Sequence, residues 1–365
     1  MKRSFPLLVL AITLGSCSMF KDSSQSSIKQ YSFRTGSTLQ LTQSITHFEL
    51  LDNADNIIYS TNDSVSLINK GKLEATFSCP GVVCFLHDNK AIHIATTQGY
   101  YRIDRATNSI TQIPLPSRKK TPAINALVFD KKGILWIGTE GEGLFSLGQD
   151  ASIHPEGTYF LISSLAVTQD SSLWIGTNIG IVRKYADGRV IRYYEETSNG
   201  ISLPDNIVEH LQVDRSQNLW IFMSSAVSVL TPRDYAGSDA SDSHEDPMTY
   251  AYLGSEATHI SKFYQHPTHP AVWWALTNDG VLKISGIQLA EEQPEGAPDK
   301  LPTPKGSIEK IETLTDTKGS SVVLTHPNDL AFDNDGNLWV ATDDELFRVG
   351  RTLLDKHARH LLSGK

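Results

Sequence analysis

The sequence has few cysteines, no long apolar segment and no excess of positive charge, and each absence excludes a class of protein. Three cysteines in 365 residues are too few for a scaffold held together by disulfides. No apolar run approaches the roughly 20 residues of a transmembrane helix. Lys and Arg number 32 against 41 Asp and Glu, without a basic stripe, so we expect no nucleic-acid partner.

The motifs of common catalytic sites are also missing. There is no Gly-x-Ser-x-Gly, no phosphate-binding glycine loop and no His-Glu-x-x-His. Helical periodicity is absent almost everywhere, and residues 353–362 are the one candidate helix. These absences favour an all-β chain and predict no cofactor.

The N-terminus has the layout of a secretory signal. Two basic residues precede an uncharged apolar run at 5–14, which is too short to span a bilayer. The ending Leu14-Gly15-Ser16-Cys17 resembles the lipobox of bacterial lipoproteins. That resemblance implies a signal peptide at 1–16, a lipid on Cys17 and a place in the cell envelope, at the periplasmic or surface face of the outer membrane. An ordinary cleaved signal peptide is the alternative. Residues 17–30, rich in Ser, Lys and Gln, predict a flexible tether.

Cys79 and Cys84 are the only other cysteines. In an oxidising compartment they predict a small loop closed by a disulfide. Two reduced, buried thiols are the alternative. The four intervening residues do not fit a CxxC redox motif.

An internal repeat organises the rest of the chain. A Leu-Trp-Ile-Gly-Thr core recurs five times with variation, and all six tryptophans lie in these copies. Two weaker copies without Trp lie upstream. The compact spacings are close to the ~40 residues of a four-stranded propeller blade. The equivalent positions, called markers below, are Ile58, His93, Trp136, Trp174, Trp220, Trp274 and Trp339.

Each copy has the pattern of short strands joined by tight turns. In the third copy, apolar residues 126–129 precede the turn Asp130-Lys131-Lys132-Gly133, where Asp accepts from turn amides and Gly permits positive φ. Residues 135–139 and 143–147 are the next two strands. The pattern predicts a seven-bladed β-propeller of four-stranded blades, with six blades as the alternative.

The propeller is expected over residues 31–350, followed by a tail at 351–365. Two long spacings contain insertions at 234–247 and 291–306, which are rich in Ser and acidic residues or in Pro. The last copy lacks a fourth strand. We expect residues 29–34 to supply it and so to close the ring.

The Leu-Trp-Ile-Gly-Thr core after an Asp-x-x-Gly turn, with Leu203-Pro204-Asp205-Asn206 before the fifth blade, resembles the two-component regulator propeller repeat. Such repeats form the extracytoplasmic sensor half of hybrid histidine kinases. The resemblance implies a sensor or recognition module that binds a glycan, another small molecule, or an envelope or signalling protein. The sequence ends at Lys365 with neither a membrane span nor a kinase, so we expect no kinase activity of its own.

Two sets of polar residues are expected around one mouth of the central channel. One lies in the turns between second and third strands, and the other lies eleven residues before each marker. Together they predict a polar, mostly acidic binding face, although turns are polar in any propeller. The turn set contains Glu140, Glu142, Asn178, Asn278, Asp279, Asp343 and Asp344, and the second set contains His47, Asn125, Ser163, Glu209 and Asn328.

Two other function classes stay open. Residues 336–339, Gly-Asn-Leu-Trp, are similar to gluconolactonases and virginiamycin-type lyases, which implies a hydrolase or lyase with one divalent cation in the channel. A scaffold in an envelope assembly is the other class. We assign no metal site: His266 and His269 lie in a proline-flanked turn, and residues 333–336 lack the downstream Glu of a calcium loop.

Overall fold

The computed structural model describes part of the chain, namely residues 28–32, 44–52, 56–70, 72–194, 203–224, 226–235, 248–250, 259–288, 305–315, 319–343 and 345–355. Several predictions lie outside these residues: the signal peptide, the lipid on Cys17, most of the tether and the turn residue Asp344. The insertions at 234–247 and 291–306 also lie outside, apart from their first or last two residues.

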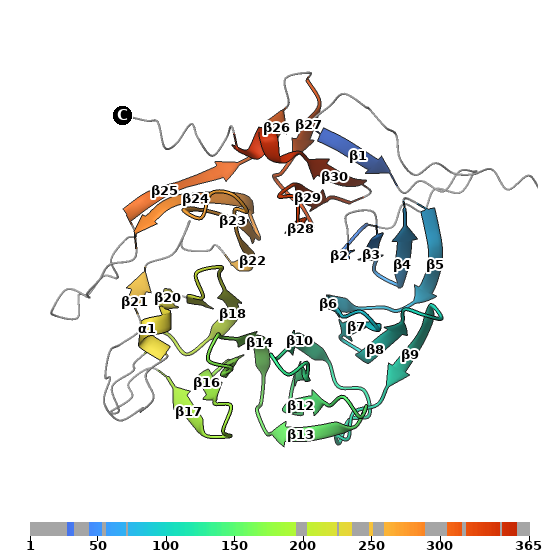
Figure 1. Ribbon diagram of the computed structural model, residues 1–365, viewed down its shortest axis with the longest axis vertical. Coiled ribbons are helices and arrows are strands. Elements are labelled where there is room, and N and C mark those ends of the chain that lie inside the picture. The colour runs from blue at the N-terminus through green and yellow to red at the C-terminus, as the bar shows by residue number, and fades with distance from the viewer. Residues whose placement is uncertain are drawn as a thin grey trace, which may run out of the picture.

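Seven four-stranded antiparallel sheets form a ring (Figure 1), which confirms the seven-bladed propeller. Residues from all seven blades line one cavity in the central channel. Blades one to three are β2–β5 (His47–Leu51, Asn56–Ser60, Ser64–Asn69, Lys72–Ser78), β6–β9 (Val82–His87, Ala91–Thr96, Gly99–Asp104, Ser109–Ile113) and β10–β13 (Ile124–Phe129, Leu135–Thr139, Leu144–Leu147, Ile153–Gly157). Blades four to six are β14–β17 (Ile162–Val167, Leu173–Thr177, Gly180–Lys184, Val190–Tyr193), β18–β21 (Val208–Val213, Leu219–Met223, Val227–Leu230, Met248–Tyr250) and β22–β25 (Ile260–Gln265, Val272–Thr277, Gly280–Gln288, Lys305–Ile311).

The seventh blade joins the two ends of the chain. It contains β28 (Asp329–Phe332), β29 (Leu338–Ala341) and β30 (Glu345–Val349), and its outer strand is β1 (Ile28–Ser32). β1 pairs antiparallel with β30, from Ile28 opposite Val349 to Ser32 opposite Glu345. The sequence placed this closing strand near residues 29–34.

In four blades, the Thr that ends the second strand and a Gly three or four residues later shape the turn that follows. In blade four, the Thr177 hydroxyl donates to the Gly180 carbonyl at 2.7 Å and accepts the Ile179 N–H at 3.1 Å. Gly180 has φ +102°, and a Cβ there would lie 2.2 Å from the Tyr193 carbonyl oxygen. The turn therefore needs Gly for its backbone and Thr for its hydrogen bonds. The same Thr hydroxyl bond recurs at Thr96, Thr139 and Thr277.

The tryptophans of the second strands link the core to the turn before them. The Nε1–H of Trp136 donates to Asp130 at 3.2 Å, that of Trp220 to Asp214 at 3.0 Å, and that of Trp339 to Asp333 at 3.0 Å. In blade four the acceptor is the Thr168 hydroxyl, 2.9 Å from Trp174. The acceptor lies six residues before each Trp because that turn has one fixed length.

Blade six departs from this arrangement. His266 occupies the acceptor position, and its N–H donates to the Val272 carbonyl at 2.7 Å across a turn two residues longer. Trp274 is fully buried, yet its Nε1 has no hydrogen-bond partner. After this blade, a hairpin of β26 (Thr313–Thr315) and β27 (Ser321–Val323) buries Leu314 and Val322 in the cluster that contains Trp274. The sequence did not predict this hairpin.

Helices are short in the described residues. α1 spans Pro232–Tyr235, and residues 351–355 form a helical turn after β30. Within the part of the chain that the structure describes, no helix is both long and apolar enough to cross a bilayer.

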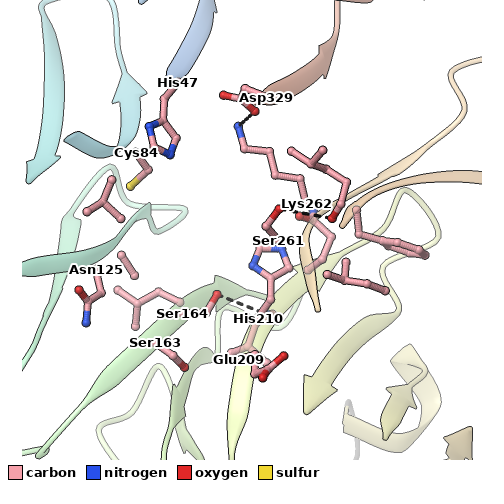
Figure 2. Close-up of a pocket in the computed structure, with 18 of the residues that line it drawn as sticks. His47, Cys84, Asn125, Ser163, Ser164, Glu209, His210, Ser261, Lys262 and Asp329 are labelled. Atoms are coloured by element: carbon pink, nitrogen blue, oxygen red, sulfur yellow. Dashed lines mark hydrogen bonds and ion pairs between the residues drawn. The ribbon is translucent and has the colours of Figure 1, made fainter. Parts of the chain in front are cut away.

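The predicted disulfide is absent, because Cys79 and Cys84 are both free thiols. Cys79 packs with Val82 and Phe85 in the hydrophobic cluster between blades one and two. Cys84 instead faces the channel (Figure 2). The prediction was wrong because the two side chains point into different compartments. Burial raises the pKa of Cys79 to about 11 and that of Cys84 to about 12, so both stay protonated at neutral pH.

Candidate functional site

A β-bulge near the start of the inner strands, the first strand of each blade, turns side chains toward the channel. The pairing with the second strand skips one residue in each of blades two to six. In blade seven, the Asn328 N–H donates to the Ala341 carbonyl just before the strand begins, so Asn328 is equivalent. These positions form the mouth: Val83, Asn125, Ser163, Glu209, Ser261 and Asn328, all of which line one cavity.

The eleven-residue spacing predicted His47 as a mouth residue. His47 instead lies one position further along its inner strand, in the layer of the channel below the mouth. Its partner across the sheet is Ser60, two residues after the marker Ile58, just as the partner of Asp329 is Ala341, two residues after Trp339. The first turn of blade one is one residue longer than that of blade seven. Counting back eleven residues therefore reaches the next layer of the channel.

The mouth residues join neighbouring blades. The Asn125 side chain donates to the Ile162 carbonyl at 3.1 Å, and that of Asn328 donates to the Ile45 carbonyl at 2.8 Å. The Glu209 carboxylate is hydrogen-bonded to His259 Nδ1 of the next blade at 2.7 Å. These contacts hold consecutive inner strands together, while the predicted ligand-binding role of these residues stays a prediction.

The turn set surrounds the mouth but does not line the cavity. Asp343 accepts from Asn328 at 3.2 Å, and Asn278 accepts the His259 N–H at 3.0 Å, so both predicted sets meet at one end of the channel. Asn178 has a buried Oδ1 without a partner. The residues outside the cavity lining are Glu140, Glu142, Asn178, Asn278, Asp279 and Asp343.

Directly below the mouth, each blade contributes one residue to a second layer around a cavity of about 430 Å³. Figure 2 shows its two unlike walls. Blades two to four supply small side chains, and blades five to seven and blade one supply titratable ones. In chain order the layer is His47, Cys84, Ala126, Ser164, His210, Lys262 and Asp329.

Lys262 and Asp329 form an ion pair in the titratable wall, with Nζ 2.7 Å from Oδ1; Asp329 is buried and Lys262 is partly exposed. Asp329 also accepts the Phe48 N–H of blade one at 3.0 Å, so this carboxylate contacts both neighbouring blades, six and one. Burial acts to lower the pKa of Lys262, but Asp329 together with Tyr264 and Glu49 outweighs it and raises that pKa. Lys262 is therefore charged at neutral pH.

Two imidazoles in the same wall have unsatisfied ring nitrogens. Nδ1 of His47 and Nε2 of His210 are buried and have no hydrogen-bond partner. Burial lowers the pKa of His210 to about 4, with Lys262 adding to the effect. Burial also lowers the pKa of His47, against the opposing effect of Asp329. Both rings are neutral at pH 7, and each can donate or accept one further hydrogen bond.

Glu49 lies two residues further along β2 and completes the charged group. Burial raises its pKa to about 7, although Lys262 acts in the opposite direction. About 35% of its side-chain surface stays open to solvent. This carboxyl group can thus gain or lose a proton near neutral pH.

Sequence reasoning missed Lys262, Asp329, His210 and Glu49, because it treated the inner strands as apolar. A signal was present: Lys262 and Asp329 each follow a mouth residue, where blades three and four have Ala126 and Ser164. A charged side chain at that small-residue position points into the channel. The eleven-residue spacing did not identify the residues of blade six, because the first turn of that blade is two residues longer.

A second, apolar surface lies beside the turn set of blade four and extends to its outer strand β17 and the neighbouring loops. A cavity of about 320 Å³ is lined by Tyr159, Phe160, Ile179, Arg192 and Tyr194, among others. Phe160 is 76% exposed and Ile179 64% exposed. Exposed apolar groups this close together are typical of surfaces that contact other molecules.

The family model for the two-component regulator propeller matches residues 120–141 and 324–344, which contain the turn and second strand of blades three and seven. The chain therefore carries two-component regulator propeller repeats. No curated protein matches the sequence.

Solved structures share the propeller fold at low identity. A streptogramin B lyase is 13% identical with a TM-score of 0.56, over 88% of this chain and 96% of that one. The extracellular domains of two hybrid two-component systems from B. thetaiotaomicron are each 14% identical. Their TM-scores are 0.60 and 0.58, over 91% and 88% of this chain but only 42% and 39% of those chains. This chain thus spans about two fifths of those domains, and the likeness shows the fold alone.

Proposed function

We propose that the chain is an extracytoplasmic recognition module, anchored by a lipid on Cys17, that binds a small polar ligand in its central channel. The observation that carries this proposal is the second layer of the channel. It places an ion pair and two unsatisfied imidazole nitrogens opposite a wall of small side chains. A cavity of about 430 Å³ has the size of small-molecule sites in proteins.

The chemistry of this wall favours an uncharged ligand rich in hydroxyl groups, such as a monosaccharide unit of a glycan. Lys262 and Asp329 neutralise each other, so the ligand needs no net charge to balance them. Their remaining hydrogen-bonding capacity, with that of His47 and His210, suits groups that both donate and accept. Ala126 and Ser164 leave room for the ligand across the cavity.

The sensor role is supported by the two-component regulator propeller repeats and by the fold shared with extracellular domains of two-component systems. The lipid anchor is supported by the Leu14-Gly15-Ser16-Cys17 sequence. In this proposal a partner protein of the envelope relays the signal, and the exposed apolar surface around Phe160 is the candidate contact.

No observation in the channel favours the metal-dependent enzyme. Among the described residues of the channel, no three metal-ligand side chains bring their ligand atoms within 4.8 Å of one another. The enzyme alternative therefore has no residue set to support it in this part of the chain.

The test fills the cavity without changing its charges. Ala126→Leu adds three carbons opposite the ion pair, and Ala106→Leu makes the same change at an exposed turn residue as the matched control. Binding of mono- and oligosaccharides to the purified chain is measured by calorimetry and by the shift of the unfolding temperature. We expect wild type and Ala106→Leu to bind a sugar and Ala126→Leu to lose at least tenfold in affinity. Equal binding by both variants would place the ligand outside the channel.

A further inference from the structure

His266, His269 and Asp355 come together at the end of the propeller opposite the mouth. The mouth forms where inner strands begin, whereas His266 and His269 lie in the turn after β22 ends. Asp355 lies in the helical turn that follows β30. Asp355 Oδ1 is 3.4 Å from His269 Nδ1 and 3.9 Å from His266 Nε2. One potential ligand atom of each residue lies within 4.8 Å of the others.

One ring nitrogen of His266, Nε2, has no structural partner, whereas Nδ1 contacts Thr268. In blades three, five and seven this position is an Asp that binds the indole N–H of its own blade. In blade six His266 is fully buried, its Nε2 has no hydrogen-bond partner, and the Trp274 indole also has none. A buried polar atom without a partner destabilises the fold. The arrangement is therefore incomplete unless something binds Nε2.

We propose that His266, His269 and Asp355 bind a late first-row divalent cation, for which Zn²⁺ is the probe. Two imidazole nitrogens and one carboxylate oxygen are a donor set that Zn²⁺ accepts in a tetrahedral site, with water in the fourth position. Ligands roughly 2.1 Å from zinc lie roughly 3.4 Å from one another. The oxygen-to-nitrogen distances of 3.4 and 3.9 Å need only small movements to reach this geometry.

The surroundings suit a bound cation. Burial, with His269 adding to the effect, lowers the pKa of His266 to about 4, which keeps its imidazole in the neutral form that binds metal. The Thr268 hydroxyl donates to Asp355 at 2.9 Å and lies 3.4 Å from His266 Nδ1. In the bound state that Nδ1–H donates to Thr268, and the long 3.3 Å contact from the Thr268 backbone N–H gives way.

The cation would fasten the C-terminal turn to blade six. Arg351 lies 3.8 Å from the other carboxylate oxygen of Asp355. Oδ1 faces the two histidines and accepts the Thr268 hydroxyl, which also lies 3.0 Å from His269 Nδ1 and would give up that contact on metal binding. The proposed metal site is separate from the channel, so its test does not depend on the proposed recognition function.

The experiment strips the purified full chain with a chelator, re-equilibrates it with Zn²⁺ and measures bound zinc by mass spectrometry and the unfolding temperature. We expect one zinc per chain at micromolar concentration and a higher unfolding temperature. His269→Ala and Asp355→Asn should each lose at least tenfold in affinity. Both residues are partly exposed, so these variants are expected to fold. Substitution of the buried His266 would also disturb packing, so it is not used to test metal binding. Substitution of Co²⁺ should give the absorption of a four- or five-coordinate nitrogen–oxygen site.

Two control variants test whether zinc binds specifically at His266, His269 and Asp355. His154→Ala removes an exposed histidine of blade three and should leave zinc binding unchanged. A double variant, His357→Ala with His360→Ala, removes tail histidines outside the described residues and should also bind normally. The proposal is overturned if wild type binds no zinc, if His269→Ala and Asp355→Asn bind like wild type, or if the tail variant loses the metal.

Discussion

The turns after the inner strands of blades six and seven have the same place in the repeat but different chemistry. In blade seven, Asp333 accepts from the Trp339 indole, the Asn337 side chain and Arg348, so every strong donor around it is satisfied. In blade six, His266 leaves the Trp274 indole without a partner and turns toward Asp355 instead. The difference shows that a repeat position released from its structural bond becomes available for other chemistry.

Among substitutions at these two turns, removal of the Asp333 carboxylate should lower the free energy of unfolding the most. Asp333→Ala leaves the Trp339 indole and the Asn337 and Arg348 donors without an acceptor, and we expect a loss of about 3 kcal/mol in the free energy of unfolding. Denaturant titration followed by tryptophan fluorescence measures it. Asp335→Ala in the same turn is the control, because Asp335 is 83% exposed and 4.0 Å from Arg348. We expect it to change stability by less than about 0.5 kcal/mol. Similar losses in both variants would contradict the central role of Asp333.

Replacing the tryptophans should give a smaller difference in stability between a blade-six variant and a blade-seven variant. Trp339→Phe and Trp274→Phe remove similar buried volume, but only Trp339→Phe also removes an indole hydrogen bond. We expect Trp339→Phe to cost about 1 kcal/mol more than Trp274→Phe in the same titration. An equal cost would mean that the Trp339 bond contributes nothing to stability.

The two turns should also differ in their response to pH. His266 has a pKa lowered to about 4 by burial, so its contribution is complete above its unfolded value near 6.5 and is lost as pH falls toward 4. Burial acts to raise the pKa of Asp333, but hydrogen bonds from Trp339 and Asn337 outweigh it and lower that pKa. Its contribution is therefore lost only as pH falls below its unfolded value near 3.9.

This pH difference is tested with His266→Gln and Asp333→Asn, each compared with wild type in the presence of a chelator. Between pH 7 and 4.5, the stability difference between wild type and His266→Gln should shrink, while that for Asp333→Asn should stay constant. Comparing differences cancels the acid response of His93 and His210, whose pKa values burial also lowers to about 4. A constant difference for His266→Gln would show that this histidine is not held neutral by the fold.

The propeller was predictable from sequence because Trp has two roles in each regular blade. It fills the space between blades and donates to an acceptor six residues earlier, so Trp136, Trp220 and Trp339 appear in the sequence at fixed distances from Asp130, Asp214 and Asp333. Blade six lacked this signal, since His266 replaces the acceptor and two residues lengthen the turn. The hairpin β26–β27 has no counterpart in other blades, so the repeat contained no information on it.

The candidate site was predictable only where turn length is constant. The eleven-residue spacing reached the mouth at Asn125, Ser163, Glu209 and Asn328, but missed by one position at His47. The charged layer below the mouth depends on which side chains the closed ring brings together across the channel. Lys262 and Asp329 are far apart in sequence and meet only because blades six and seven are neighbours.

The pairing of β1 with β30 also constrains how the protein is made. β1 leaves the ribosome before any blade exists, and its partner is the last strand of the propeller to be synthesised. Until then β1 has an unpaired edge that could bind another chain. The ring therefore closes only with its last strand, and a chain that is cut short before β30 cannot close it however well its first six blades have formed.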